Sequence, residues 1–444
     1  MGLCISTLGS RATTRVQSDN SSECNMPVPH QILIYAELLS NIRQVSVGCS
    51  LHTPSSSSTK AGISSDGLEL TISHDGVESS VRLPGQVASP QQLPIQSKAT
   101  KSLSWRLSLA ASSRPLALTV SDAQTVPWSA SSLQPESAIR CRKCQNVIVN
   151  AGCVKVWKDL PSENWAEMME FWHCHKPHDH KHGDDEGLAS RGYGANARIL
   201  AQPGVGFVDL TSFLLSETDV SNAAITNSPS PSTLSNGVAA PHEKYNKDNT
   251  SSPEADSLVA FCGSCKSHLG VLNSQTSSIS LFKWQVSVNE TIQRGPSTPP
   301  NLCHYVSAML LATMARSGCS KSIVMPMKSQ IEPAQNGSSP THNGTSQSLL
   351  NIWVFNANIV FSSTGERRSP IPAIKVLYRM VSPDEADKML ESMTSDMQDI
   401  TLPADAIEIV LGILSRSNGF VPQHDRKFRE WTVGLLEKWD DGGG

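Results

Sequence analysis

The chain has 444 residues, a formal net charge of −4 and 38% hydrophobic residues. Its length allows two or three domains, but long Ser-, Pro-, Gly- and Asn-rich stretches predict that the folded part is much shorter than the chain. The slightly acidic balance excludes the general basic footprint of direct nucleic-acid binding, and no apolar run is long enough to span a bilayer.

The N-terminus carries an acylation pattern. Gly2 with Ser6 fits the N-myristoylation motif, and Cys4 is placed to take a palmitate. Two acyl chains would hold the protein on a membrane, whereas one would not. The alternative is an unmodified tail within a disordered leader over residues 1–29. We therefore expect membrane association only if the N-terminus is acylated.

Short β patterns separated by turn residues begin after this leader. Strands are predicted over residues 31–39, 44–51, 68–72, 77–83 and 102–109. Asp75-Gly76 joins two of them as a hairpin, because this pair supplies the positive φ that a tight turn needs. Residues 102–109 alternate strictly between polar and apolar, which is typical of a half-buried strand. These strands predict an antiparallel sandwich or barrel-like body.

Two short cysteine motifs, which we call the cysteine hooks, lie far apart in the chain. Cys141-Arg-Lys-Cys144 precedes a strand-like stretch, and Cys262-Gly-Ser-Cys265 follows one. A tetrahedral zinc site needs four ligands, and each hook supplies two. The hooks therefore predict one structural zinc site that clamps two distant segments. A redox-active Cys-x-x-Cys and four unrelated core thiols are the alternatives.

The cysteine content also bears on the compartment. The eleven cysteines are an odd number, which argues against a fully paired disulfide framework in so long a chain. Metal hooks fit a reducing compartment. We therefore expect the protein in the cytoplasm and nucleus.

A dense cluster of aromatic, cysteine and histidine residues follows the first hook. A helix predicted from Pro161 carries an apolar stripe at helical spacing, formed by Trp165, Met168, Met169 and Trp172. Cys174 and His175 come directly after this stripe. Such a helix could dock on a partner and offer it a thiolate and an imidazole. The alternative is an exposed His-rich loop, which we favour for His178, His180 and His182.

The second half of the chain alternates polar insertions with regular elements. Strands are predicted over residues 281–288, 352–361 and 371–381, and helices over 303–316, 383–393 and 403–417. Ser382 begins a capping box with Pro383 at the first helical position. Cys303 lies at a predicted helix start, where the helix dipole would lower its thiol pKa, although a small core residue is the alternative.

We predict a β-rich α+β fold. An antiparallel N-terminal β body and a C-terminal α+β part are joined by the zinc-bound hooks, with long disordered insertions between them. The parts are the leader (1–29), an N-terminal β-rich part with the first hook and the Trp/Cys-His segment (30–215), an insertion (216–257), a part with the second hook, a strand and a helix (258–328), an insertion (329–348) and the C-terminal α+β part (349–440).

These residues, in this order, resemble a known family. The matching parts are Ile32-Leu-Ile-Tyr-Ala-Glu37, the first hook, the Trp165 to His175 segment, the second hook with Leu269-Gly270, and Leu281-Phe-Lys-Trp284. Residues 31–440 resemble the HECT-like ubiquitin-conjugating-enzyme-binding proteins, a eukaryotic family to which ubiquitin-ligase activity is attributed. The Trp-x-Cys-His segment is the most specific part of the resemblance.

The resemblance implies that the protein binds a ubiquitin-conjugating enzyme and ubiquitin, and promotes ubiquitin transfer to substrates or to itself. In a HECT-type reaction, a ligase thiolate takes ubiquitin from the thioester of the conjugating enzyme and passes it to a lysine. The last cysteine here is Cys319, whereas HECT domains carry their nucleophile near the C-terminus. The catalytic thiol is therefore unassigned; Cys303 and Cys174 are candidates, and a binding module without catalysis is the alternative.

The resemblance also implies a second function. The Trp/Cys-His segment looks like motifs that occupy the metal centre of metallo-β-lactamase-type RNA endonucleases in mRNA 3′-end processing. The partner-binding residues would then be Trp165, Met168, Trp172, Cys174 and His175, with Cys174 and His175 as ligands of the partner's zinc. The protein would be a non-catalytic assembly factor or inhibitor.

Overall fold

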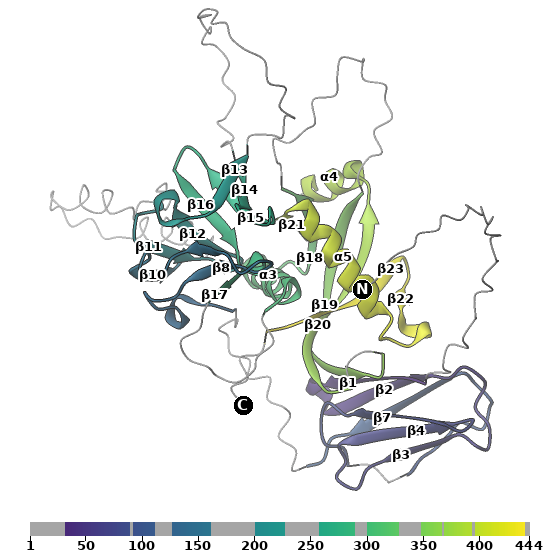
Figure 1. Ribbon diagram of the computed structural model, residues 1–444. Helices are drawn as coiled ribbons and strands as arrows, with labels where there is room; N and C mark the ends of the chain where they lie inside the picture. The colour runs from purple at the N-terminus through teal and green to yellow at the C-terminus, as the bar shows by residue number, and fades with distance from the viewer. Residues whose placement is uncertain are drawn as a thin grey trace, which may run out of the picture.

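The computed structural model of the protein describes residues 32–88, 92–111, 127–160, 200–226, 257–288, 300–327, 348–365, 368–392 and 396–439. Within these ranges the strands form four sheets, and three α-helices accompany them. Figure 1 shows the N-terminal strands in purple, the unit that carries the hooks in blue and teal, and the C-terminal strands and helices in green and yellow. The fold is β-rich, as predicted.

The largest sheet combines the beginning and the end of the chain. Its strand order is β22 (Lys427–Phe428), β23 (Trp431–Glu437), β20 (Ile371–Val381), β19 (Leu349–Ser363), β1 (Leu33–Leu39), β2 (Gln44–Ser50) and β7 (Ser102–Ser108). The strands β18 (Lys321–Pro326) and β21 (Met397–Leu402) extend it beside β19. β1 is antiparallel to β19, with Tyr35 opposite Ser363. The N-terminal and C-terminal parts therefore share one sheet.

The expected N-terminal sandwich is formed between this sheet and a four-stranded sheet. The four strands are β5 (Val77–Arg82), β4 (Glu69–His74), β3 (Lys60–Ile63) and β6 (Gln92–Leu93), in that order. Apolar residues of both sheets form a common core, among them Ile34, Val47 and Leu70. The β4–β5 hairpin turns at Asp75 and Gly76, with φ of 49° and 79°, which confirms the turn predicted from this pair.

Two smaller sheets form the unit that carries the hooks. The seven-stranded sheet has the order β10 (Val156–Asp159), β11 (Val205–Val208), β12 (Ser212–Ser216), β16 (Ser278–Phe282), β15 (His268–Asn273), β14 (Ser257–Cys262) and β13 (Ala223–Thr226). The three-stranded sheet has the order β17 (Val286–Val288), β8 (Ile139–Cys141) and β9 (Val147–Val149). β13 lies inside the expected insertion 216–257, where it pairs with β14.

The strand predicted over residues 281–288 is two strands. The 3₁₀ turn η4 (Lys283–Gln285) separates β16 from β17 and buries Lys283 and Trp284. Lys283 Nζ donates to the carbonyl oxygens of Pro127 and Trp128 at 3.2 and 3.1 Å. These contacts satisfy the buried ammonium and hold the turn. The break carries the chain from the seven-stranded sheet to the three-stranded sheet.

The three helices predicted in the second half of the chain are confirmed as α3 (Leu302–Ser317), α4 (Pro383–Glu391) and α5 (Ala404–Asn418). The helix predicted from Pro161 lies outside the described ranges. The Ser382 hydroxyl caps α4 by accepting from the backbone N–H of Glu385 at 3.2 Å. α3 and α5 both contact β23. One hydrophobic core continues from the hook unit through α3 to the large sheet, and includes Leu281, Tyr305 and Val376. No helix in the described ranges combines the length and apolarity needed to cross a membrane.

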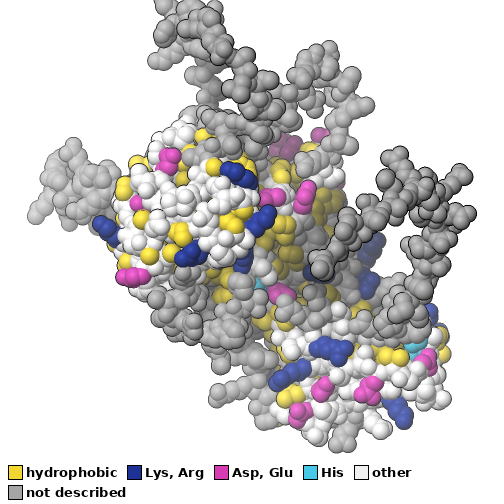
Figure 2. All heavy atoms as spheres, in the orientation of Figure 1, with side chains coloured by type: hydrophobic (Ala, Val, Ile, Leu, Met, Phe, Trp, Pro, Cys, Tyr) yellow, Lys and Arg dark blue, Asp and Glu magenta, His cyan; other side chains and the backbone are white. Residues whose placement is uncertain are grey.

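Charged side chains of both signs share the molecular surface. Figure 2 shows Lys and Arg interspersed with Asp and Glu over the described residues of one face. This mixture agrees with the formal net charge of −4. Interspersed charges do not produce the single-sign field that steers a polyanion to a protein.

A buried ion pair ties the first strand to the C-terminal half. Lys375 on β20 pairs with Glu37 on β1, and Tyr35 donates to the same carboxylate at 2.7 Å. The Glu37 side chain is 6% exposed. Lys375→Met would leave this carboxylate without its cation, so we expect the free energy of unfolding to fall by about 3 kcal/mol. Urea denaturation followed by tryptophan fluorescence measures the change.

Lys321→Met is the matched control for this prediction. Lys321 and Lys375 both lie on strands of the large sheet, and each ammonium lies over an aromatic ring. The Asp396 partner of Lys321 is 64% exposed, so its loss should cost less than about 1 kcal/mol. Equal losses of unfolding free energy in Lys375→Met and Lys321→Met would contradict a larger contribution from the buried pair.

Candidate metal centre

Both hooks are tight turns that begin at the last residue of a strand. Cys141 ends β8, and its carbonyl oxygen accepts from the backbone N–H of Gln145 at 2.8 Å. Cys262 ends β14, and its carbonyl oxygen accepts from the backbone N–H of Lys266 at 2.9 Å. Gln145 and Lys266 both adopt left-handed φ, of 60° and 59°. The two hooks therefore share one backbone structure, although they lie in different sheets.

The four hook sulfurs converge on one point. Cys141 Sγ lies 3.6 Å from Cys265 Sγ, and Cys144 Sγ lies 3.6 Å from Cys262 Sγ. All four sulfurs lie within 4.8 Å of one another. Zinc–sulfur bonds of about 2.3 Å in a tetrahedron place the sulfurs roughly 3.8 Å apart. The cluster therefore has the ligand number, ligand type and spacing to hold a metal ion such as zinc.

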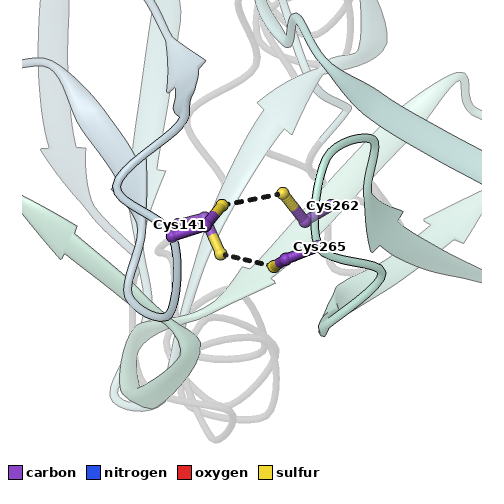
Figure 3. Close-up of side chains that lie close together, drawn as sticks. Cys141, Cys262 and Cys265 are labelled. Atoms are coloured by element: carbon purple, nitrogen blue, oxygen red, sulfur yellow. Dashed lines mark hydrogen bonds between the residues drawn. The ribbon is translucent and has the colours of Figure 1, made fainter. Parts of the chain in front are cut away.

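The two close contacts bear on the alternatives left by the sequence. Each joins a sulfur of one hook to a sulfur of the other, as Figure 3 shows for the facing hairpins. Four unrelated core thiols would not meet in this way. A redox Cys-x-x-Cys would act within one hook, whereas here the two hooks form one shared cluster.

The hook thiols differ in burial and in acidity. Cys141 and Cys262 are fully buried at the strand ends, whereas Cys144 is exposed. Hydrogen bonds from the side chain and backbone of Ser267 lower the pKa of Cys265 to about 6, and burial raises the pKa of Cys141 to about 12. A metal ion binds thiolates, so binding expels protons from such a cluster, and its affinity for the ion rises with pH.

The hooks lie between the two sheets of their own unit. They bring the end of β8, in the three-stranded sheet, against the end of β14, in the seven-stranded sheet. The expectation that they join the N-terminal β body to the C-terminal part is corrected, because backbone pairing of β1 with β19 makes that connection. The first hook also contacts η4 and the residues just before α3: Arg142 donates to the carbonyl oxygens of Trp284, at 3.1 Å, and of Pro300.

Comparisons with known proteins identify the family. Residues 37–433 match the family described as HECT-like Ubiquitin-conjugating enzyme (E2)-binding. The chain belongs to this family. Uncharacterized protein C1734.10c of Schizosaccharomyces pombe is 24% identical over 336 residues, which cover 72% of this chain and 80% of that protein. Uncharacterized protein YJR141W of Saccharomyces cerevisiae is 40% identical over 52 residues, 11% of this chain and 15% of that protein. No solved structure matches the chain.

The match to the HECT-like E2-binding family confirms the resemblance seen in the sequence. The matched range includes both hooks, η4 and the three described helices. The family name refers to binding of a ubiquitin-conjugating enzyme, which is therefore the partner class that the family membership indicates. The motif residues Leu269 and Gly270 lie on β15, directly after the second hook.

Cys303 is a buried core residue, which was the alternative interpretation to a reactive thiol. It is 3% exposed, and the backbone N–H of Glu437 donates to its sulfur at 3.0 Å. Burial raises its pKa to about 12, so desolvation outweighs the expected lowering by the helix dipole. A reciprocal capping box that was not predicted begins α3: Asn301 Oδ1 accepts from the His304 N–H, and His304 Nδ1 accepts from the Asn301 N–H. His304 is therefore part of the cap of α3.

The other predicted site residues lie outside the described ranges. They are Gly2, Cys4, Trp165, Met168, Trp172, Cys174 and His175. The structure describes the strands that precede and follow the Trp/Cys-His segment in the chain. These strands, β10 and β11, are parallel neighbours, with Asp159 opposite Val208. β10 is the edge strand of the seven-stranded sheet. The role of the segment itself stays a prediction.

Proposed function

We propose that the protein is a HECT-like ubiquitin-protein ligase that binds a ubiquitin-conjugating enzyme and promotes transfer of ubiquitin to substrates or to itself. The observation that carries the proposal is the family match over residues 37–433, which includes the three described helices and part or all of every described strand. Reducing compartments, the cytoplasm and nucleus, would keep the described cysteines as free thiols.

We further propose that the hook cluster holds a structural zinc ion. Four cysteines complete the tetrahedral shell and leave no open position for water or substrate, which is the arrangement of structural rather than catalytic zinc. Bound there, zinc would crosslink the β8–β9 and β14–β15 hairpins. Through Arg142, the same crosslink would support the start of α3.

The described thiols bear on how ubiquitin would be transferred. A covalent relay needs an accessible thiolate. Burial raises the pKa values of Cys49 and Cys303 to about 12, and the four hook thiols are committed to the cluster. Between the two candidate thiols, Cys303 and Cys174, a relay would therefore use Cys174, which lies outside the described ranges. Without a relay, the protein would hold the charged conjugating enzyme so that a substrate lysine attacks its thioester directly.

Purified components test the proposal. The full chain is incubated with ubiquitin-activating enzyme, ATP, ubiquitin and a set of conjugating enzymes, and ubiquitin discharge from each thioester is followed on non-reducing gels. We expect faster discharge for at least one conjugating enzyme and ubiquitin adducts on the chain itself. A relay through Cys174 predicts a hydroxylamine-sensitive ubiquitin adduct that Cys174→Ala abolishes, whereas Cys303→Ser leaves it unchanged.

Two outcomes would go against ligase activity. One is that no conjugating enzyme binds the chain or discharges faster in its presence. The other comes from affinity capture: recovery of a metallo-β-lactamase-type RNA endonuclease instead of a conjugating enzyme, lost on Trp172→Ala or Cys174→Ala, would favour the assembly-factor alternative. Capture that survives both substitutions would reject that alternative as well.

A further inference from the structure

A second group of metal-ligating side chains lies in the N-terminal sandwich, away from the hooks. His74 is the last residue of β4, and Asp75 follows it in the β4–β5 turn. His52 lies in the connection between β2 and β3, which folds over this turn. The His52 and His74 rings meet edge to face, with centroids 5.3 Å apart. His74 is fully buried, although it is a polar residue at the end of an outer hairpin.

The ligand atoms of this group converge. Asp75 Oδ2 lies 3.2 Å from His74 Nε2 and 3.9 Å from His52 Nε2, and each residue offers a ligand atom within 4.8 Å of the other two. Bonds of about 2.0–2.2 Å to nitrogen and oxygen place ligand atoms of one ion roughly 3–4 Å apart. Two imidazoles and one carboxylate are a donor set for a borderline divalent cation of the zinc type, whereas calcium and magnesium prefer oxygen alone.

The surrounding hydroxyls hold these side chains in place. Thr53 Oγ1 donates to Asp75 Oδ2 at 2.6 Å, and Ser58 Oγ donates to Asp75 Oδ1 at 3.3 Å. Thr59 Oγ1 lies 2.8 Å from His74 Nδ1 and also accepts from the Ser56 N–H. When a histidine binds a metal through one ring nitrogen, a hydrogen bond at its other ring nitrogen fixes the orientation of the ring. Thr59 is placed to make this bond to His74 Nδ1.

The proton balance of this group allows an ion to bind. Thr53 gives its only proton to Asp75, so its 2.7 Å contact with His74 Nε2 requires a proton on that nitrogen. Metal binding needs the Nε2 lone pair. The neutral ring meets this need by carrying its proton on Nδ1 instead and donating it to Thr59 Oγ1. No proton is lost in this exchange, and the ion replaces the Thr53 hydroxyl as the partner of His74 Nε2.

We infer that His52, His74 and Asp75 form a second metal site, with nitrogen and oxygen ligands, for a divalent cation of the zinc type. The site differs from the hooks in being open. The His52 and Asp75 side chains are 23% and 42% exposed, so an ion can arrive from solvent and keep a coordination position for water or for a partner's side chain.

Cobalt binding to the full chain tests the site. The protein is purified with zinc in the hooks and with His178, His180 and His182 replaced by alanine, because those histidines could also bind cobalt. Equilibrium dialysis against Co²⁺ should show one further bound ion per chain, with visible d–d bands but without the sulfur-to-cobalt charge-transfer bands of thiolate ligands. His52→Ala and Asp75→Asn should each weaken this binding at least tenfold.

The controls separate the site from surface binding and from loss of fold. His424→Ala and Asp425→Asn change another His–Asp pair, whose Nε2 and Oδ2 atoms are also 3.2 Å apart; no third ligand joins that pair among the described residues, so cobalt binding should not change. Unaltered hook zinc and circular dichroism in His52→Ala and Asp75→Asn show that they are folded. Cobalt bound in empty hooks would show thiolate charge-transfer bands. Failure of the hook proposal can therefore be told apart from failure of the second site. Equal cobalt binding by all variants, or thiolate bands for every bound ion, would overturn the second site.

Discussion

Cys141→Ser and Cys265→Ser are each expected to abolish soluble, folded protein. Each substitution leaves three thiols in a cluster that joins two sheets, and a hydroxyl is a poor replacement for a thiolate on zinc. Apparent zinc-binding energies in small peptides are on the order of 10 kcal/mol, and much of this is folding energy. Soluble yield, metal content by elemental mass spectrometry and thermal melting measure the effect.

Cys319→Ser is the control for the hook substitutions. Cys319 is also a free, partly exposed cysteine, but it lies outside the cluster. Its substitution should change the free energy of unfolding by no more than about 1 kcal/mol. A strong chelator should lower the melting temperature of the wild-type protein and of Cys319→Ser alike. Purified wild-type protein without a bound transition metal, or a soluble Cys141→Ser with an unchanged melting temperature, would contradict the zinc proposal.

Gly270→Ala should destabilise the hook unit by about 3 kcal/mol or more, because it forces two paired strands apart. Gly270 lies on β15 between β14 and β16. A Cβ at this position would collide with the backbone carbonyl oxygen of Ser280 and lie 3.0 Å from Leu281 Cα. Both obstacles are backbone atoms of the neighbouring strand, so no side-chain rotation relieves them. Since β15 follows the second hook, we also expect weaker retention of its metal.

Gly412→Ala is the control for Gly270→Ala. Gly412 lies on the exposed side of α5, and a Cβ there would meet nothing within 4 Å. Alanine is the better helix former, so Gly412→Ala should stabilise the protein by about 1 kcal/mol. Chemical denaturation of both variants, with metal content measured in parallel, tests the pair. A loss of stability in Gly412→Ala, or none in Gly270→Ala, would contradict the close approach of β15 and β16.

The sequence by itself determined the features that depend on local spacing. The hooks were predictable because two cysteines separated by two residues can bind one ion, and two such turns complete a shell. The Asp75-Gly76 hairpin and the capped α4 were predictable because turn geometry and helix termini select particular residues within a few positions. The family resemblance followed from the same short motifs.

Only the tertiary structure decided which distant segments meet. The residue pattern predicts a strand over 31–39 but does not reveal that this strand pairs with residues near 361. The burial of Cys303 against Glu437 and the break of the 281–288 strand at Lys283 also depend on contacts made far along the chain. His52 and His74 carry no recognisable spacing as ligands. Their meeting with Asp75 depends on how a loop folds over a turn, and such long-range packing leaves no periodic signal in the sequence.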